Sequence, residues 1–174
     1  MVLREALAEN KEIVTEKWLD IVLSAYHEDG AHFFKKQKDQ FANPAGYNAK
    51  TGLEKAVAGL ASGQPWELPP ELLQFIKLRA VQSMSPSEAV AFIYDLKRII
   101  VEVCGKDLFS ANISEWLIIE AELDKLALQV FEHYVADREL IYKVKVQELK
   151  SGNAVVAEGG CPSGAMMKKH MKRN

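Results

Sequence analysis

The sequence predicts an all-α protein: a single helical domain of about six helices that ends in one long helix. Three observations lead to this prediction. Apolar residues recur at three- and four-residue steps, which is the period of an amphipathic helix. Serine, threonine, asparagine, proline and glycine stand where helices commonly begin and end. No alternating run of residues is bounded by hairpin turns, so no strand is predicted.

The first predicted helix covers residues 2–26, and Asp29-Gly30 follows it as a stop signal. Its apolar stripe consists of Leu3, Leu7, Val14, Trp18, Ile21 or Val22, and Ala25. A short second helix is predicted to hold Phe33, Phe34 and Phe41. This second helix ends before Pro44, because the residue before a proline is disfavoured in the helical region. The sequence then predicts a loop over residues 45–50.

Two further helices are predicted in the middle of the chain. Thr51 and Glu54 form a capping box, and the helix that they open ends at Gly63. Pro70 suits the first position of the next helix, since proline there loses no hydrogen bond. The sequence therefore predicts two helices separated by a connector over residues 64–69.

The strongest start signal lies at residues 85–88. Ser85 and Glu88 form a capping box with Pro86 at the first helical position. Gly105 marks the end of this helix. We therefore expect one amphipathic helix between these two signals.

The last helix is predicted to run over residues 112–150, which is roughly 55 Å at 1.5 Å per residue. Asn112 and Glu115 form its capping box. Leu126, Leu128 and Phe131 widen its apolar face, so its first half is predicted to pack on the domain. The main stripe consists of Trp116, Ile119, Leu123, Ala127, Val130, Tyr134 and Ile141.

The apolar pattern of this helix narrows after Asp137. Ile141, Val144 and Leu149 then form a seam among charged residues, which is typical of a helix that pairs with another helix. The sequence therefore predicts a homodimer through this seam. The alternative is a single helix that wraps on its own domain.

The charge divides the chain into two parts. Residues 1–150 carry 18 Lys and Arg against 23 Asp and Glu, whereas residues 151–174 carry a net charge of +3. The acidic domain argues against nucleic-acid binding through the fold. Residues 151–174 are rich in small residues and predict a flexible basic tail that contacts an acidic partner or a membrane surface.

The sequence predicts a cytoplasmic protein without a structural disulfide. Charged residues interrupt the apolar N-terminus, so no secretory signal is visible. No uncharged run reaches the roughly 18 residues that a membrane span needs. The two cysteines stand in different settings.

No catalytic motif is present in the sequence. It lacks a phosphate loop, HExxH and GxSxG, so we expect no enzyme activity and no cofactor. The alternative is a small redox, metal or haem-responsive protein. Such a protein would use Cys161, which lies near methionines that suit Cu(I), or His133 as a haem ligand.

One block of the sequence resembles a family signature. It runs from Arg79 to Val90 (RAVQSMSPSEAV) and continues to Leu96-Lys97-Arg98. The block resembles the N-terminal sensory domain of the RsbR/RsbRD-type co-antagonists of the bacterial stressosome. Trp18 and the loop that contains Asn43-Pro44 match the family as well. The resemblance covers roughly residues 3–150.

This resemblance implies a non-catalytic signal-input domain that is often dimeric, and whose last helix passes a conformational change to an output module. Related inputs have a globin-like fold that binds no haem. Only 24 residues follow Lys150, which is too few for an output domain of roughly 100 residues. We therefore expect a stand-alone input or adaptor that acts on a regulatory partner in trans.

Five residues are predicted to bind a ligand or partner: Phe33, Phe34, Arg79, Gln82 and Lys97. The last three are polar groups in largely apolar helices, so they need partners if they are buried. The alternative is that they are ordinary residues of helix surfaces.

Overall fold

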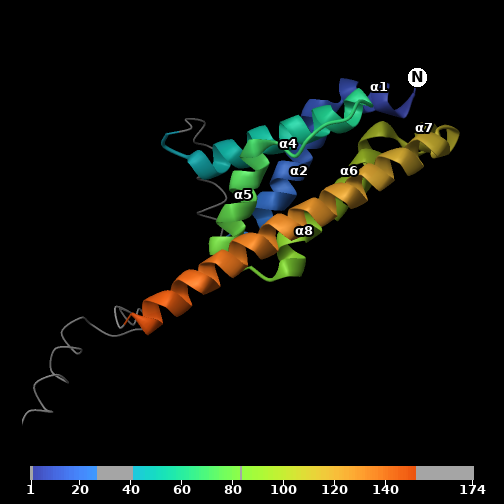
Figure 1. The fold of residues 1–174 in the computed structure, drawn as a ribbon. Helices are drawn as coiled ribbons and strands as arrows, with labels where there is room; N and C mark the ends of the chain where they lie inside the picture. The colour runs from blue at the N-terminus through green and yellow to red at the C-terminus, as the bar shows by residue number, and fades with distance from the viewer. Residues whose placement is uncertain (1, 27–40, 83, 152–174) are drawn as a thin grey trace, which may run out of the picture. The chain divides into compact units, whose positions relative to one another are not determined.

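The computed structural model describes residues 2–26, 41–82 and 84–151, and these residues form seven helices and no strand (Figure 1). The all-α prediction is therefore confirmed. The helices are α1 (Leu3–Glu9), α2 (Lys11–Ser24), α4 (Pro44–Ser62), α5 (Pro70–Val81), α6 (Pro86–Cys104), α7 (Lys106–Ala111) and α8 (Ile113–Lys150).

The predicted first helix is wrong in one respect, because the chain breaks at Asn10 into α1 and α2. The side-chain amide of Asn10 donates to the carbonyl of Ala6 at 2.8 Å. Asparagine competes in this way with the helical hydrogen bonds. The predicted stripe is nevertheless buried from Leu3 to Val22, whereas Ala25 at its end is exposed. The indole of Trp18 donates to the carbonyl of Phe92 at 2.6 Å. This bond ties α2 to α6.

The predicted loop over residues 45–50 is also wrong, because α4 begins at Pro44. The Asn43 side chain accepts from the amide of Gly46 at 2.9 Å. Asn43-Pro44 therefore starts a helix, with asparagine as the cap and proline at the first position. The predicted capping box at Thr51 lies inside this helix. The helix predicted around Phe33 and Phe34 lies outside the described residues.

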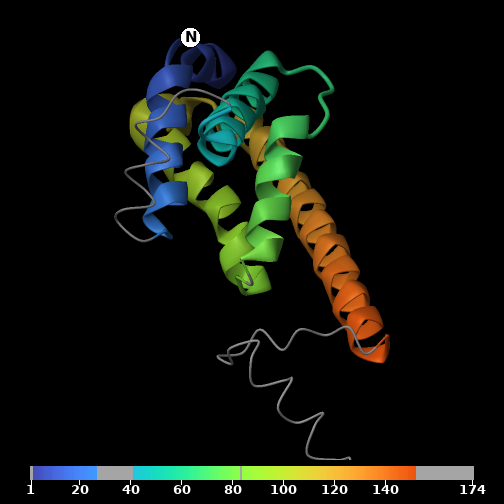
Figure 2. The same ribbon diagram turned by 90° about the vertical axis from the view of Figure 1, so that its left-hand side faces the viewer.

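Helices α4 and α5 lie side by side, as both ribbon views show (Figures 1 and 2). Gly52 makes this approach possible: a Cβ atom there would lie 2.6 Å from the backbone nitrogen of Leu72. Helix α4 ends at Gly63, which has a φ of 66°. The predicted end of this helix is therefore confirmed.

The predicted starts of α5 and α6 are confirmed. Pro70 is the first residue of α5. Ser85 Oγ accepts from the amide of Glu88 at 3.3 Å, and the Glu88 carboxylate accepts from the amide of Ser85 at 2.9 Å. Gly105, with a φ of 87°, ends α6 as predicted. The short helix α7 that follows was not predicted.

The start of α8 differs from its prediction. The carboxylate of Glu115 accepts from the backbone amide of Leu3 at 2.6 Å, and the Asn112 side chain donates to the carbonyl of Leu108 at 2.8 Å. These contacts replace the predicted capping box. The predicted main stripe is buried from Trp116 to Tyr134.

The described residues belong to two compact units, Met1–Arg138 and Glu139–Asn174. In the first unit, Arg4 of α1 donates to the carbonyl of Leu60 in α4 and to Glu122 of α8 at 2.7 Å. The second unit is described over residues 139–151, which are the end of α8 and one turn residue. Across the described ranges, no helix is long and apolar enough to span a membrane.

Candidate functional site

Arg79 joins three helices of the first unit. Its side chain is 1% exposed. From α5, the guanidinium donates to the carbonyls of Glu88 at 3.2 Å and Ala89 at 3.4 Å in the first turn of α6. It also donates to the carbonyl of Val22 in α2 at 3.3 Å. The burial of Arg79 is therefore compensated by main-chain acceptors.

Two aromatic rings cover the same guanidinium. Its central carbon lies 4.9 Å from the ring centroid of Phe75 and 4.7 Å from that of Phe92. Cation–π attraction is strengthened when the cation is desolvated, as it is here. Trp18 stacks on Phe92, with the two ring centroids 5.7 Å apart. Within the described residues, Nε is the one nitrogen of the Arg79 guanidinium that lacks a hydrogen-bond acceptor.

Tyr26 is the titratable neighbour of Arg79. Burial raises the pKa of the Tyr26 phenol, and the charge of Arg79 opposes this rise. Burial likewise lowers the pKa of Arg79, and Tyr26 opposes this change. Each group thus favours the charged form of the other. Tyr26 is the last residue of the described stretch 2–26, and Arg79 lies on α5.

The connection between α5 and α6 is held from α8 as well. The Tyr134 hydroxyl donates to the carbonyl of Met84. Arg138 donates to the carbonyl of Ala80 at 3.0 Å. We call the end of α5, the connection and the first turn of α6, described over residues 80–82 and 84–89, the α5–α6 corner. Side chains from α5 and α8 therefore donate hydrogen bonds to the same stretch of backbone.

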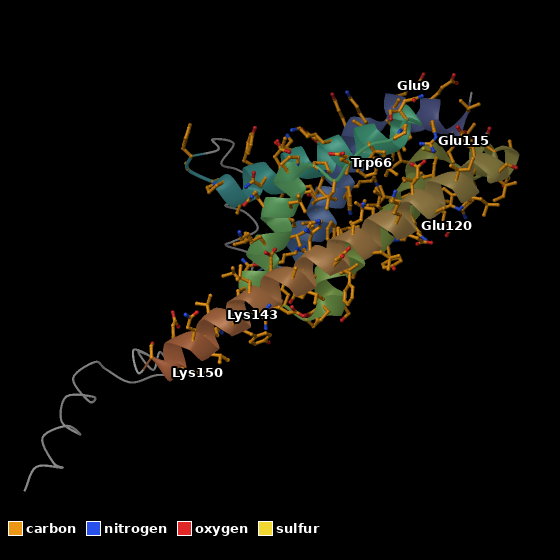
Figure 3. The ribbon with its side chains drawn as sticks, in the orientation of Figure 1. Glu9, Trp66, Glu115, Glu120, Lys143 and Lys150 are labelled. Carbon is orange, nitrogen blue, oxygen red and sulfur yellow. The ribbon has the colours of Figure 1, made fainter. Side chains whose placement is uncertain are left out.

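Lys97 links α6 to α8, farther along α6 than the first turn that Arg79 contacts. Its ammonium group lies 2.7 Å from Asp124 and 3.1 Å from Glu120, and 5.6 Å from the ring centroid of Tyr94. Figure 3 labels Glu120 on α8. Burial lowers the pKa of Lys97, but the hydrogen bonds to the two carboxylates outweigh this effect, so its pKa is raised.

The predicted binding residues do not form one cluster. Lys97 stands eight residues beyond Ala89, the last α6 residue to which Arg79 donates, which is about 12 Å along the helix. Gln82 is exposed and caps the end of α5 through its backbone amide. Phe33 and Phe34 lie outside the described residues.

A groove between α6 and α8 was missed by the sequence analysis. Leu128 and Phe131 were predicted to widen the core face, but they are 68% and 45% exposed, and only Leu126 is buried. The groove has a volume of about 490 Å³ and an apolar lining. It is lined by Pro86, Ser87, Val90, Ala91, Tyr94, Ala127, Leu128 and Phe131. A second row of apolar residues on α8 was the signal that could have revealed the groove: Leu117, Ala121, Leu128, Phe131 and Val135.

Of the two residues predicted for the alternative redox or haem function, the structure describes His133. His133 is exposed on α8. The other cysteine of the chain, Cys104, is half-buried, and burial raises the pKa of its thiol. Cys161 lies outside the described residues. The parts of the chain that the structure describes contain no group of three or more His, Cys, Asp or Glu side chains that could hold a metal.

These features define an all-helical domain with a buried arginine centre and an open apolar groove. The chain belongs to the family of RsbT co-antagonist protein RsbRD N-terminal domains, whose model matches residues 12–149. The family predicted from the Arg79–Arg98 block is therefore confirmed, and it is a family of regulatory domains. No curated protein and no solved structure matches the chain. The globin-like arrangement stays a prediction.

Proposed function

We propose that this protein is a non-catalytic, stressosome-like signal-input or adaptor domain that regulates a partner protein in trans by binding to it. The observation that carries the proposal is the family match over residues 12–149. A co-antagonist acts on another protein, so binding suffices for this function. The proposal includes a bacterial, cytoplasmic setting and no bound cofactor.

The contacts of the α5–α6 corner support a route for the signal. Arg79 ties this corner to α2, and Tyr134 and Arg138 tie it to α8. Coupling between sites can be carried by packed side chains, hydrogen bonds and secondary-structure elements that have two arrangements. We propose that a change at the corner repositions α8, and that α8 carries the change to the partner.

Homodimerisation through the end of α8 is part of the proposal. In the second unit, Val144 is 47% exposed and Leu149 is 66% exposed, while Ile141 is partly covered. Apolar residues at helical spacing favour pairing with another helix. The variant Ile141→Glu/Val144→Glu is expected to raise the dissociation constant of the dimer, as measured by sedimentation. Lys143→Glu, an exposed position in the same stretch, serves as the matched control.

The binding roles of Phe33, Phe34, Arg79, Gln82 and Lys97 remain predictions. Gln82 is the clearest to test, because it is exposed and its side chain has no hydrogen bond within the described residues. Replacing Gln82 with alanine removes a side-chain amide and keeps the helix cap, which uses the backbone. The predicted contact of residues 151–174 with an acidic partner or a membrane surface also stays a proposal.

Affinity capture with the full chain in its native host tests the function. We expect one regulatory protein to co-purify reproducibly, and its purified form to bind the chain with a dissociation constant in the micromolar range or tighter. The variant Ile13→Glu changes an exposed apolar residue of α2 and serves as a control. Failure of every captured protein to bind in purified form would contradict the proposal.

A further inference from the structure

The groove between α6 and α8 is apolar throughout and lies within the first unit. Its eight lining residues, all in the described part of the chain, are uncharged. Val90 and Ala127 are buried and form its floor, whereas Tyr94, Leu128 and Phe131 are exposed and form its walls. Single exposed apolar residues are common, but a contiguous apolar surface with a polar rim indicates an interaction site.

The shape of the groove suits a helix better than a small molecule. A small-molecule site encloses most of its ligand, whereas Leu128 and Phe131 are 68% and 45% exposed. A groove of this kind accepts the apolar stripe of a further helix. On α6 the lining extends from Pro86 to Tyr94, about 12 Å, which corresponds to about two turns of a docked helix.

Carboxylates stand one turn before and one turn after the middle of each wall. On α8 they stand four positions on either side of Leu128, and on α6 they stand three and four positions from Ala91. The four carboxylates are those of Asp124, Glu132, Glu88 and Asp95. Residues at these spacings are neighbours on one helix face. The groove is therefore apolar inside and acidic along both rims.

Two of these carboxylates have basic partners. Lys97 lies 2.7 Å from Asp124, but it also lies 3.1 Å from Glu120, so one ammonium group serves two acids. Arg98 lies 3.4 Å from Asp95, and the Arg98 side chain is largely exposed. An exposed pair of this kind is weak, so its carboxylate stays available to another cation.

The remaining charges leave the rims acidic. Glu132 and Lys125 are exposed and have no ion pair within the described residues. Together with Glu120, the described residues within a turn of the lining provide five carboxylates against three basic groups. A second copy of the chain would present the same excess of acids and would be repelled, whereas a basic partner would be attracted.

We propose that this groove docks a basic amphipathic helix of the partner protein. The inference rests on the proposed function and adds the chemistry of the partner surface. Apolar side chains of that helix, spaced by three and four positions, would fill the space between Tyr94, Leu128 and Phe131. Lysine and arginine beside them would lay their methylene stems along the walls and reach the rim carboxylates.

A helix in this groove would also contact the α5–α6 corner. Pro86 and Ser87 line the groove and belong to the first turn of α6, where Arg79 donates to the carbonyl of Glu88. Docking over about two turns is smaller than a standard interface, so we expect an affinity in the micromolar range.

Fluorescence anisotropy of a labelled synthetic peptide, titrated with the full chain, tests the inference. The probe is a helical peptide of about 18 residues, with leucine at the anchor positions and lysine and arginine beside them. A second peptide carries glutamate in place of the basic residues, and a third carries glutamine in place of the leucines. We expect the first peptide to bind at least about tenfold tighter than either of the others. Its dissociation constant should rise with salt concentration.

Variants of the chain locate the binding. Leu128→Gln/Phe131→Gln removes two apolar walls and is expected to weaken binding of the first peptide about tenfold. Glu132→Gln removes one rim carboxylate and is expected to weaken it about threefold. Ile13→Gln and Glu12→Gln make the same kinds of change at exposed positions of α2 and should leave the affinity unchanged. Circular dichroism confirms that each variant is folded.

Several results would overturn the inference. They are equal binding of the first and second peptides, equal binding of the first and third peptides, and groove variants that bind like the wild type. Groove variants that lose self-association but keep peptide binding would show that a second copy occupies the groove. A captured partner whose binding survives Leu128→Gln/Phe131→Gln would leave the proposed function intact and exclude the groove as its site.

Discussion

Arg79 is the residue on which the packing of α2, α5 and α6 depends. It combines three main-chain acceptors with two aromatic faces, and it is almost fully enclosed. Its identity as arginine matters, because a planar guanidinium donates in several directions and stacks on rings at the same time, whereas lysine offers one compact charge.

Replacing Arg79 should therefore destabilise the fold strongly. Arg79→Lys and Arg79→Met remove the hydrogen bonds to three carbonyls and the stacking of the guanidinium on two rings, and we expect a loss of about 3 kcal/mol in the free energy of unfolding. Urea denaturation measures the change. Arg98→Met is the control, because Arg98 is exposed on α6 and should change stability by less than about 0.5 kcal/mol. Equal midpoints for the two sites would contradict the role of Arg79.

The capping box of α6 gives a pH-dependent prediction. Its hydrogen bonds with Ser85 lower the pKa of Glu88 from its usual value of 4.5. The stabilisation is therefore present above pH 4.5 and is lost as the pH falls through the lowered pKa. Glu88→Gln should be less stable than wild type at neutral pH and equally stable in acid. Ser85→Ala should cost about 1 kcal/mol at neutral pH. A difference for Glu88→Gln that grows in acid would refute this account.

At the scale of the helices, local signals were predictable and tertiary ones were not. The starts of α5 and α6 follow from prolines and a capping box within four residues. Glu115 looked equally local, yet its carboxylate binds the amide of Leu3, far away in sequence. Asn43-Pro44 was ambiguous because the same pair can end one helix or begin the next.

The candidate site shows the same division. Arg79 and Lys97 were identified as polar residues that need partners. The partners are main-chain carbonyls for Arg79 and carboxylates for Lys97, and they lie on other helices. Spacing along one helix cannot identify such partners. The groove was missed because Leu128 and Phe131 are as apolar as core residues. Only the packing of α6 against α8 decides which apolar side of α8 is buried.

The contact between α4 and α5 gives a prediction at this scale. Gly52→Ala would place a methyl group 2.6 Å from the backbone nitrogen of Leu72, so the helices must separate. We expect a loss of about 1–3 kcal/mol, because overpacking costs this much in a filled core. Thermal denaturation measures it. Lys50→Ala, at an exposed position of α4, should leave the melting temperature nearly unchanged.

At the scale of the whole molecule, α8 belongs to both units. Its buried residues extend from Trp116 to Tyr134, and residues 142–150 are all exposed. An isolated helical segment without buried contacts is marginal in water, so pairing with another helix would stabilise it. This end of α8 is therefore where association with another chain would change the protein most.

Hydrogen exchange should reveal this difference along α8. Amides of residues 116–134 are expected to exchange slowly at all protein concentrations, because they open only with the core. Amides of residues 142–150 are expected to exchange fast in dilute protein and more slowly as the concentration rises. In Ile141→Glu/Val144→Glu, this concentration dependence should disappear. Slow exchange of residues 142–150 in dilute protein would show that pairing is not what protects them.

Apart from its own capping box, the α5–α6 corner is held by side chains that donate to main-chain carbonyls. Arg79, Tyr134 and Arg138 provide the donors. A carbonyl is present whichever amino acid occupies the acceptor position, so a mutation there requires no compensating change in the donor. Comparison of related sequences should therefore show invariant donors and no covariation with the acceptor positions. A contact map inferred from covariation would leave this corner blank.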